Sequence, residues 1–328
     1  MKESMRRATL TDVADAAQVS LKTASRVING VATVHPELRD RVLEAASMLA
    51  YRPHRGAATM RSGTSDMVGM VIRDMANIFY SRVAAGAADV AGEQECLVIT
   101  CSSEGVADQE AKLLEAVFAQ RPRGLLITPT ATPQPLILAE MALGCAVVAI
   151  DEPLVGLDVD SVSFDNYGAS REALGAALEL GRNRFAILSD TDRLATMPPR
   201  IQGAKDALAE RGLGVLPEME IRTAHTDEQA HEAIVGLLSL AEPPDAVFCA
   251  NNISALAAAS EVRARGLDVA IVAFDNFPLS HTLPQPVVLV EHDDREMGRA
   301  AARLLFERLT DPGRETHHLT MRTQVRRY

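Results

Sequence analysis

The N-terminal residues best suited to chemistry are hydrogen-bond donors on one short helical pattern. The pattern follows the capping residue Ser20, and its polar positions hold Lys22, Thr23, Ser25, Arg26 and Asn29. Lysine and arginine neutralise phosphates and donate to the edges of guanine. An earlier helical pattern ends about three residues before this one, and two helices so joined can lay the second in the major groove of DNA. We therefore expect a DNA-reading helix here.

Polar residues also follow three apolar runs further along the chain. They are Asp151, Asn251 and Asp275. An isolated Asp or Asn at such a place is commonly a turn or helix-capping residue. Together, at the carboxyl ends of parallel strands where ligands of α/β sheets bind, they are more typical of ligand contacts.

Other chemistry has little support in the sequence. The four cysteines have no paired metal-ligand spacing, and most lie in strand-like apolar runs, so we expect reduced core thiols: Cys96, Cys101, Cys145 and Cys249. No G-x-G-x-x-G, P-loop, G-x-S-x-G or H-E-x-x-H motif occurs, and His317-His318 has no partner at ligand spacing. We therefore expect no enzyme, metal or cofactor. A secreted solute-binding protein is the other rival, and the charged start without a signal segment argues against it.

Three short helices are predicted before residue 50. Thr9 and Asp12 form a capping-box pattern that opens the first, and Pro36 opens the third, which should end at Leu49. The expected buried stripes are Leu10, Val13, Ala14 and Ala17, then Ala24, Val27 and Ile28, then Leu38, Val42, Leu43, Ala46 and Leu49.

The charge of the chain is divided unevenly. The net charge is −11, yet residues 1–62 hold ten Lys or Arg against six Asp or Glu and therefore carry +4, while the remainder carries −15. The basic end can neutralise phosphates, and the acidic remainder should be repelled by them.

After residue 64, apolar runs of strand length alternate with helical patterns. Strands are predicted at 67–72, 96–101, 124–128, 146–150, 184–188, 245–249 and 269–274, and helices include 110–120, 167–180 and 201–211. This alternation indicates parallel sheets covered by helices, in two sets that divide near Phe164. A cleft between two such lobes is the natural ligand site.

The N-terminal pattern resembles the lactose/galactose-repressor (LacI/GalR) family of bacterial transcription regulators. That family reads T-x-x-D-V-A-x-x-A-G-V-S-x-x-T-V-S-R-V-x-N, then V-S-x-x-T-R-x-x-V and L-G-Y-x-P-N, which match residues 9–29, 34–42 and 49–54. The resemblance implies these DNA contacts: Thr9, Ser20, Leu21, Lys22, Thr23, Ser25, Arg26, Asn29, Tyr51, His54 and Met60. Leu21 and Lys22 take its two base-reading positions; an ordinary solvated lysine is the alternative for Lys22. Gln18 replaces the turn glycine, which implies a strained or altered turn, and His35 replaces a capping serine.

The resemblance further implies a domain plan. Residues 1–52 form an all-α helix-turn-helix domain, and residues 53–63 form a hinge helix that orders on DNA and wedges Met60 into the minor groove. A flexible linker is the alternative for the hinge. Residues 64–328 form an α/β core like type I periplasmic binding proteins, with one doubly wound lobe at about 64–164 and 293–318 and the other at about 165–292 and 319–328.

The same resemblance extends to the ligand cleft of the core. It implies these effector contacts: Phe79, Tyr80, Asp151, Arg200, His225, Asn251, Asp275 and His292. For Arg200 a purely structural role, such as an ion pair between the lobes, is the alternative. His225 lies near a position that is often a large aromatic in the family, and this change favours a more polar or anionic ligand.

The resemblance implies a cytoplasmic, ligand-responsive repressor. It should bind palindromic operator DNA as a homodimer, and a small sugar-like metabolite between the lobes should set its DNA affinity. No apolar run approaches the ~18 residues of a membrane span.

Overall fold

The computed structural model describes residues 6–31, 33–52, 65–130, 134–278 and 280–328. The chain divides into two compact units between Ser65 and Asp66, and each is described by itself. The predicted hinge at 53–63, with His54 and Met60, lies outside the described residues.

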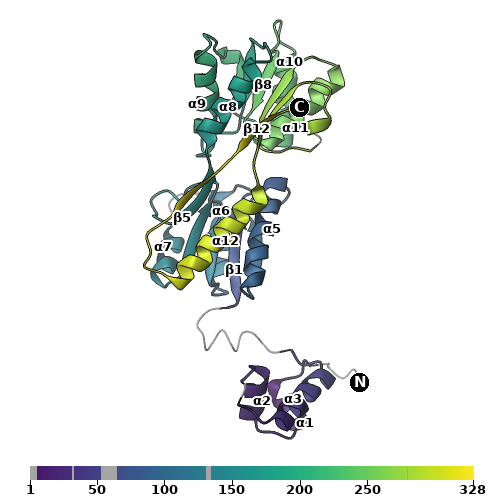
Figure 1. The fold of residues 1–328 in the computed structure, drawn as a ribbon, viewed down its shortest axis with the longest axis vertical. Helices are drawn as coiled ribbons and strands as arrows, with labels where there is room; N and C mark the ends of the chain where they lie inside the picture. Colours follow the sequence, from purple (N-terminus) through teal and green to yellow (C-terminus); the bar gives the residue numbers. More distant parts are fainter. Residues whose placement is uncertain (1–5, 32, 53–64, 131–133, 279) are drawn as a thin grey trace. The chain divides into compact units, whose positions relative to one another are not determined.

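The described residues of the first unit form three helices, α1 (Leu10–Ala16), α2 (Leu21–Ile28) and α3 (Pro36–Met48) (Figure 1). The capping box of α1 is confirmed, since the Thr9 hydroxyl accepts from the Asp12 amide and the Asp12 carboxylate accepts from the Thr9 amide. Ser20 caps α2 by accepting from the Thr23 amide at 3.1 Å. A small apolar core joins the helices: Val13, Ala14, Ala17, Ala24, Val27, Val42 and Ala45.

Two tight turns in this unit have strained backbone. Gln18 has φ +52° and Ala50 has φ +47°, in the left-handed region that favours glycine. Both stand where the LacI/GalR pattern has glycine. The guanidinium of Arg41 donates to the carbonyl oxygens of Ala17 at 2.5 Å and Gln18 at 3.3 Å, which holds the first turn in place.

The predicted buried stripe of the third helix is wrong in part. Leu43 is 49% exposed and Leu49 is 37% exposed, and the buried residues of α3 are Val42 and Ala45. Leu43 follows Val42 by one residue, and a helix turns about 100° per residue, so Leu43 points away from the core.

The second unit contains two mainly parallel sheets. The first sheet has strand order β11-β5-β4-β3-β1-β2 and the second β12-β10-β9-β8-β6-β7. The strands are β1 (Met67–Ile72), β2 (Leu97–Ser102), β3 (Gly124–Ile127), β4 (Ala146–Ile150), β5 (Asp160–Phe164), β6 (Phe185–Leu188), β7 (Glu220–Ile221), β8 (Ala246–Cys249), β9 (Ala270–Phe274), β10 (Val287–Glu291), β11 (His318–Met321) and β12 (Gln324–Arg327). The seven predicted strands are confirmed, with ends that differ by at most one residue.

Helices cover these sheets and complete two lobes (Figure 1). The first lobe contains α5 (Ile78–Glu93), α6 (Ala107–Phe118), α7 (Pro135–Ala142) and α12 (Asp294–Thr310). The second lobe contains α8 (Asn166–Leu178), α9 (Met197–Ala209), α10 (Asp227–Leu238) and α11 (Asn252–Arg265). Each lobe has its own apolar core on both sides of its sheet.

The chain crosses between the lobes three times, and the last crossing corrects a predicted boundary. The predicted boundary puts residues 319–321 in the second lobe, but β11 pairs in parallel with β5 of the first lobe as far as Met321 opposite Phe164. Only β12 joins the second lobe, where it pairs antiparallel with β10. The ladder bonds to β5 therefore keep these three residues in the first lobe.

Close contact between α5 and α12 depends on two glycines. A Cβ at Gly86 would lie 1.9 Å from the carbonyl oxygen of Arg295, and a Cβ at Gly298 would lie 1.9 Å from that of Val83. The two helices therefore pack backbone against backbone. Arg295 and Arg299 of α12 also bind the Asp89 carboxylate of α5 at 2.8 and 2.9 Å.

Candidate functional site

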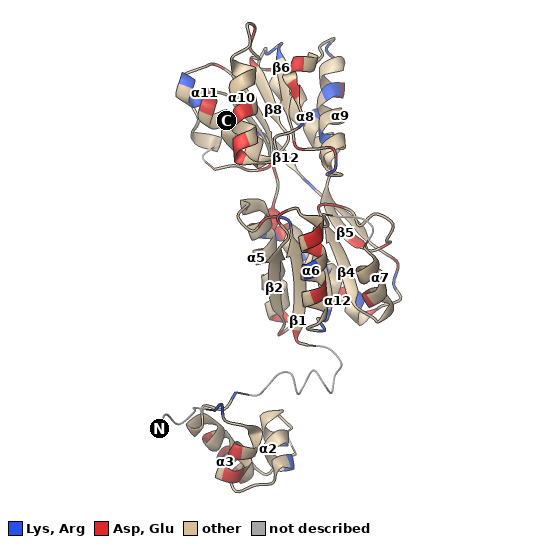
Figure 2. Cartoon of the chain, turned by 180° about the vertical axis from the view of Figure 1, so that it is seen from behind, with Lys and Arg blue, Asp and Glu red and all other residues tan. Residues whose placement is uncertain are grey.

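Helix α2 presents the donors predicted to meet DNA. Leu21 is 51% exposed, and Lys22, Arg26 and Asn29 are also exposed. Lys22 and Arg26 are the only charged residues of α2, so this helix is purely cationic (Figure 2). Arg26 donates to the Thr33 hydroxyl at 2.5 Å, which orients its guanidinium from the following loop.

The predicted hydroxyl contacts also shape the ends of the helices. Ser20 and Thr23 share a hydrogen bond of 2.9 Å, and the Asn29 side chain donates to the Ser25 carbonyl oxygen at 2.7 Å. Thr9 is engaged with Asp12, as described above. These hydrogen bonds fix the orientation of the side chains. A phosphate would therefore meet polar groups that are already held in place.

Tyr51 packs against the apolar core of the first unit and is only partly exposed. Its amide donates to the Ala46 carbonyl oxygen at 2.8 Å, closing the turn after α3. The structure thus gives Tyr51 a packing role beside the predicted DNA contact.

In the second unit, a cavity of about 390 Å³ lies between the two lobes. Seven of the eight predicted effector residues line it: Phe79, Tyr80, Asp151, Arg200, His225, Asn251 and Asp275. The three polar residues that follow strands come together here, since Asp151 follows β4, Asn251 follows β8 and Asp275 follows β9. The strand ends therefore form the floor of the cleft.

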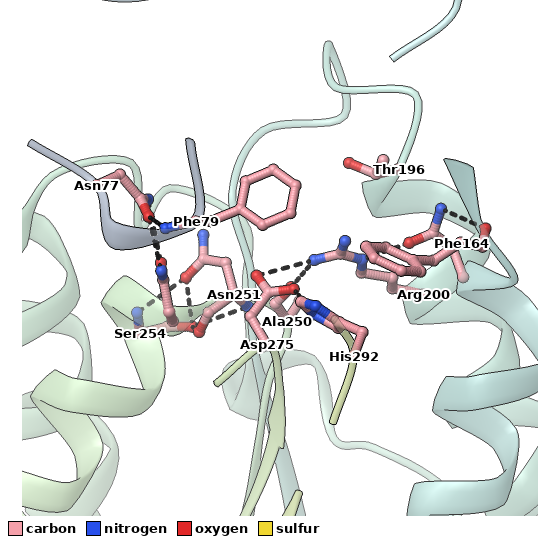
Figure 3. Close-up of polar contacts among 12 residues, drawn as sticks. Asn77, Phe79, Phe164, Thr196, Arg200, Ala250, Asn251, Ser254, Asp275 and His292 are labelled. Carbon is pink, nitrogen blue, oxygen red and sulfur yellow. Dashed lines mark hydrogen bonds and ion pairs between the residues drawn. The ribbon is translucent and has the colours of Figure 1, made fainter. Parts of the chain in front are cut away.

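Arg200 is held rigidly in the second lobe and is only 4% exposed (Figure 3). Its guanidinium donates to the Ala250 carbonyl oxygen at 2.7 Å and to Asn166 Oδ1 at 2.7 Å, and it lies 3.4 Å from the Asp275 carboxylate. Its Cζ also lies 3.7 Å from the centre of the Phe274 ring. These partners all belong to the second lobe, so the ion pair with Asp275 does not connect the lobes, and the structural role that these contacts give Arg200 lies within one lobe.

His292 does not line the cleft, which corrects the prediction. It lies beneath the cleft at the second crossing, where Nε2 contacts the Asp275 carboxylate at 3.0 Å and Nδ1 contacts the Asp294 carboxylate at 2.5 Å. Its ring stacks on Phe164 with centres 4.3 Å apart. Burial opposes the charged imidazole, but the hydrogen bonds to both carboxylates outweigh it and raise the pKa of His292 to about 9. The imidazolium thus joins a cleft carboxylate to the first residue of α12.

The carboxylates of the cleft floor differ in protonation. Burial raises the pKa of Asp151 to about 7, against the attraction of Arg200. For Asp275, burial also acts upward, but Arg200 and His292 hold its pKa below the ordinary value. Both residues have positive φ, +65° for Asp151 and +78° for Asp275, so strained backbone places the two carboxylates at the strand ends.

The sequence interpretation missed the residues that hold the two lobes together. Glu152 of the first lobe accepts from the amides of Ala195 and Thr196, at 2.7 and 3.3 Å, just before α9 of the second lobe. Asn77 and Asn252 exchange side-chain hydrogen bonds of 3.2 and 2.8 Å across the cleft (Figure 3). The only sequence signal for Glu152 is its place beside Asp151, and the two asparagines are ordinary helix-start residues in the sequence.

The charges around the cleft oppose an anionic ligand. His225 Nδ1 lies 2.9 Å from the Asp190 carboxylate, so this histidine is already engaged with an anion. Eight carboxylates line the cleft against two arginines. The hypothesis of a more polar or anionic effector, which rests on His225, stays a prediction, and these carboxylates disfavour its anionic form.

Two family models cover nearly the whole chain. Residues 9–54 match "Bacterial regulatory proteins, lacI family", and residues 65–327 match "Periplasmic binding proteins and sugar binding domain of LacI family". The chain belongs to the LacI family. This LacI-family protein is a DNA-binding regulator that responds to a ligand, with the reading helix in its first unit and the effector-binding core in its second.

Relatives of this LacI-family regulator match it over nine tenths or more of its length. The transcriptional repressor PurR of Aliivibrio fischeri is 28% identical, over 97% of this chain and 96% of its own length. Catabolite control protein A of Priestia megaterium is 30% identical, over 90% and 91% respectively. The structure of a complex of the regulator CelR with cellobiose is 28% identical and superposes with a TM-score of 0.70 over 98% of both chains.

The described part of this LacI-family chain contains no group of three or more His, Cys, Asp or Glu residues placed to hold a metal ion. Within the same ranges, none of the helices combines the length and apolar content needed to span a bilayer.

Proposed function

We propose that this protein is a cytoplasmic repressor that binds palindromic operator DNA as a homodimer. A small polyhydroxylated effector in the cleft lowers or raises its affinity for that DNA. The observation that carries the effector proposal is the convergence of Arg200, Asn251 and Asp275 on one cleft floor. Planar guanidinium and carboxylate groups each hold two hydroxyl groups in fixed geometry, which suits a sugar-like molecule.

The DNA contact is proposed for the exposed face of α2. Lys22 there is placed to donate to guanine, and Leu21 to touch a thymine methyl group. Arg26 and the capping residues Ser20 and Asn29 are proposed to contact the groove and its phosphates. Tyr51, Thr9, Thr23 and Ser25 are proposed as further contacts.

A homodimer is supported by apolar side chains on neighbouring elements of the first lobe. Leu97 and Ile99 on the edge strand β2 are 59% and 43% exposed, and Ile78 at the start of α5 is 40% exposed. A two-fold dimer presents two reading helices to a palindrome, which needs them one helical turn or a multiple apart.

Regulation is proposed to act through the angle between the lobes. The effector touches both lobes, and the bonds that join them at Glu152 and Asn77–Asn252 are broken or made as that angle changes. By linkage, an effector that changes DNA affinity must bind the two arrangements unequally, and DNA must change effector affinity by the same factor.

The test begins with DNA selected from a random pool by the full-length protein. Lys22→Ala should weaken binding to the selected site by about 1–3 kcal/mol, whereas Lys112→Ala, an exposed lysine of α6 in the core, should leave it unchanged. Compounds that raise the melting temperature should then shift operator affinity. Equal binding by Lys22→Ala and Lys112→Ala, or a bound compound with no effect on DNA affinity, would contradict the proposal.

A further inference from the structure

The lining of the effector cleft carries a large excess of negative charge. Its carboxylates are Asp74, Glu104, Asp151, Glu152, Asp190, Asp227, Glu228 and Asp275, and its cations are Arg73 and Arg200. Eight against two leaves an excess of six negative charges when Asp151 is ionised and five when it is protonated. Hydroxyl groups alone do not neutralise such a field, whereas a bound cation does.

Most of these carboxylates already have partners within the protein. Asp275 is paired with Arg200 and His292, and Asp190 with His225. Glu152 accepts from the backbone before α9. Asp227 and Glu228 stand in the first turn of α10, where the helix dipole favours negative charge.

Asp151 is the exception among the described residues of the cleft floor. Its Oδ1 atom is buried and has no hydrogen-bond partner within the described protein. The nearby cation Arg200 is committed through Nε and Nη1 to Asn166, Ala250 and Asp275. A buried carboxylate oxygen without a donor is costly, and a ligand that supplies a donor there recovers that free energy.

The surroundings of Asp151 show what kind of donor suits it. Burial raises the pKa of Asp151 to about 7, and the charges that act on it are Arg200 and His292, which favour its ionised form, and Glu152 and Asp275, which oppose it. Two of these neighbours are carboxylates that would repel the ionised form of Asp151. A hydroxyl or an ammonium group can donate to Oδ1, but only the positively charged nitrogen is also attracted by the carboxylates of Asp151, Glu152 and Asp275.

We propose that the effector is a polyhydroxylated molecule that carries a cationic amine, with the ammonium group against Asp151 and the hydroxyl groups toward Arg200 and Asn251. This inference rests on the proposed function, since it takes the cleft as the effector site. It narrows the effector class from sugars in general to amino sugars and amino cyclitols.

The test measures binding to the full-length protein by isothermal titration at pH 7.5 with matched compounds. The panel contains glucosamine, galactosamine, mannosamine and an aminocyclitol, each with its hydroxyl parent and its N-acetyl form. At least one amine should bind about tenfold or more tightly than both its parent and its N-acetyl form, because acetylation removes the charge and leaves the ring intact. The inference is overturned if no amine in the panel binds, or if parents or N-acetyl forms bind as tightly as the amines.

A variant pair locates the amine. Asp151→Asn should reduce the preference for the amine over its N-acetyl form to within about twofold, because a neutral amide no longer favours the charged nitrogen. Asp158→Asn removes the same charge from a side chain that is 76% exposed and outside the cleft lining, and should keep the full preference. Equal preference in both variants would place the amine elsewhere and overturn the assignment to Asp151.

The same measurements distinguish a failure of the amine proposal from a failure of the proposed function. A neutral or acidic compound that binds and changes operator affinity would leave the regulatory function standing and overturn the amine. An amine that binds selectively without changing operator affinity would support a cationic ligand for the cleft. It would overturn the role of that ligand as an effector.

Discussion

At the scale of single residues, Arg200 both shapes the cleft and stabilises the second lobe. Sequence reasoning treats it as a contact with the effector, but its burial and its bonds to Asp275, Asn166 and the Ala250 carbonyl oxygen make it part of the core. Removing one partner of a buried ion pair strongly destabilises the fold, because the remaining charge loses its compensation.

We therefore predict that Arg200→Met lowers the free energy of unfolding by about 3 kcal/mol and also abolishes effector binding. Adding Asp275→Asn should recover part of the lost stability without restoring binding, since it removes the carboxylate that has lost Arg200 and keeps only His292 as a partner. Urea denaturation followed by circular dichroism measures the free energy of unfolding of both variants. If the double variant is less stable than Arg200→Met, the ion pair is not the reason for the loss.

His292 gives the molecule a pH-dependent contribution to stability. Its pKa is raised from the ordinary value of 6.5 to about 9 in the folded chain. A histidine with a raised pKa stabilises the fold fully below its unfolded pKa, and this contribution is lost as pH rises through the folded value.

The stability difference between wild type and His292→Gln should therefore be larger at pH 6.5 than at pH 9.5. Parallel urea titrations of both proteins at the two pH values measure it. A difference that is the same at both pH values, or larger at pH 9.5, would show that His292 is neutral in the folded chain.

At the scale of elements, the packing of α12 on α5 is sensitive to any side chain added at the two contact glycines. Gly86→Ala places a Cβ against the carbonyl oxygen of Arg295, so the helices must separate, and we expect a loss of about 2 kcal/mol or more. Gly92 belongs to the same helix and has no atom within 4 Å of its would-be Cβ. Gly92→Ala should therefore be neutral or stabilising by up to about 1 kcal/mol. Thermal unfolding of both variants tests the contact, and equal melting temperatures would contradict it.

The elements that sequence patterns predict are those whose signals are local. Thr9 and Ser20 directly precede the helices that they cap. The apolar runs of β1 and β4 are the strands themselves. The positions of these elements therefore follow from neighbouring residues alone. Strands β5, β11 and β12 are short or alternate in burial, and their pairing is set by chain crossings far apart in sequence. No local pattern contains that information.

The candidate site divides in the same way. Asp151, Asn251 and Asp275 are predictable because each ends an apolar strand. The positions of His292 beneath the cleft and of Glu152 and Asn252 between the lobes depend on how three crossings place one lobe on the other. Those placements come from tertiary packing, so sequence reasoning assigned His292 to the lining and overlooked the other two.

At the scale of the whole molecule, a cationic DNA-binding unit is joined to an acidic ligand-binding unit. Residues 1–62 carry +4 and the rest of the chain −15, so the first unit attracts the DNA phosphates and the second is repelled by them. Coupling between them is a free energy shared by both sites, and it must act in both directions.

The most direct test compares the full chain with a chain containing only residues 66–328, using DNA selected by the full-length protein. The core keeps both complete sheets, so it should retain its ligand affinity within about twofold, while its affinity for the selected DNA should fall by at least about 100-fold because the reading helix is absent. Fluorescence anisotropy at fixed salt measures the DNA affinity of both proteins. If the core alone binds the selected DNA as tightly as the full chain, the assignment of DNA recognition to α2 is contradicted.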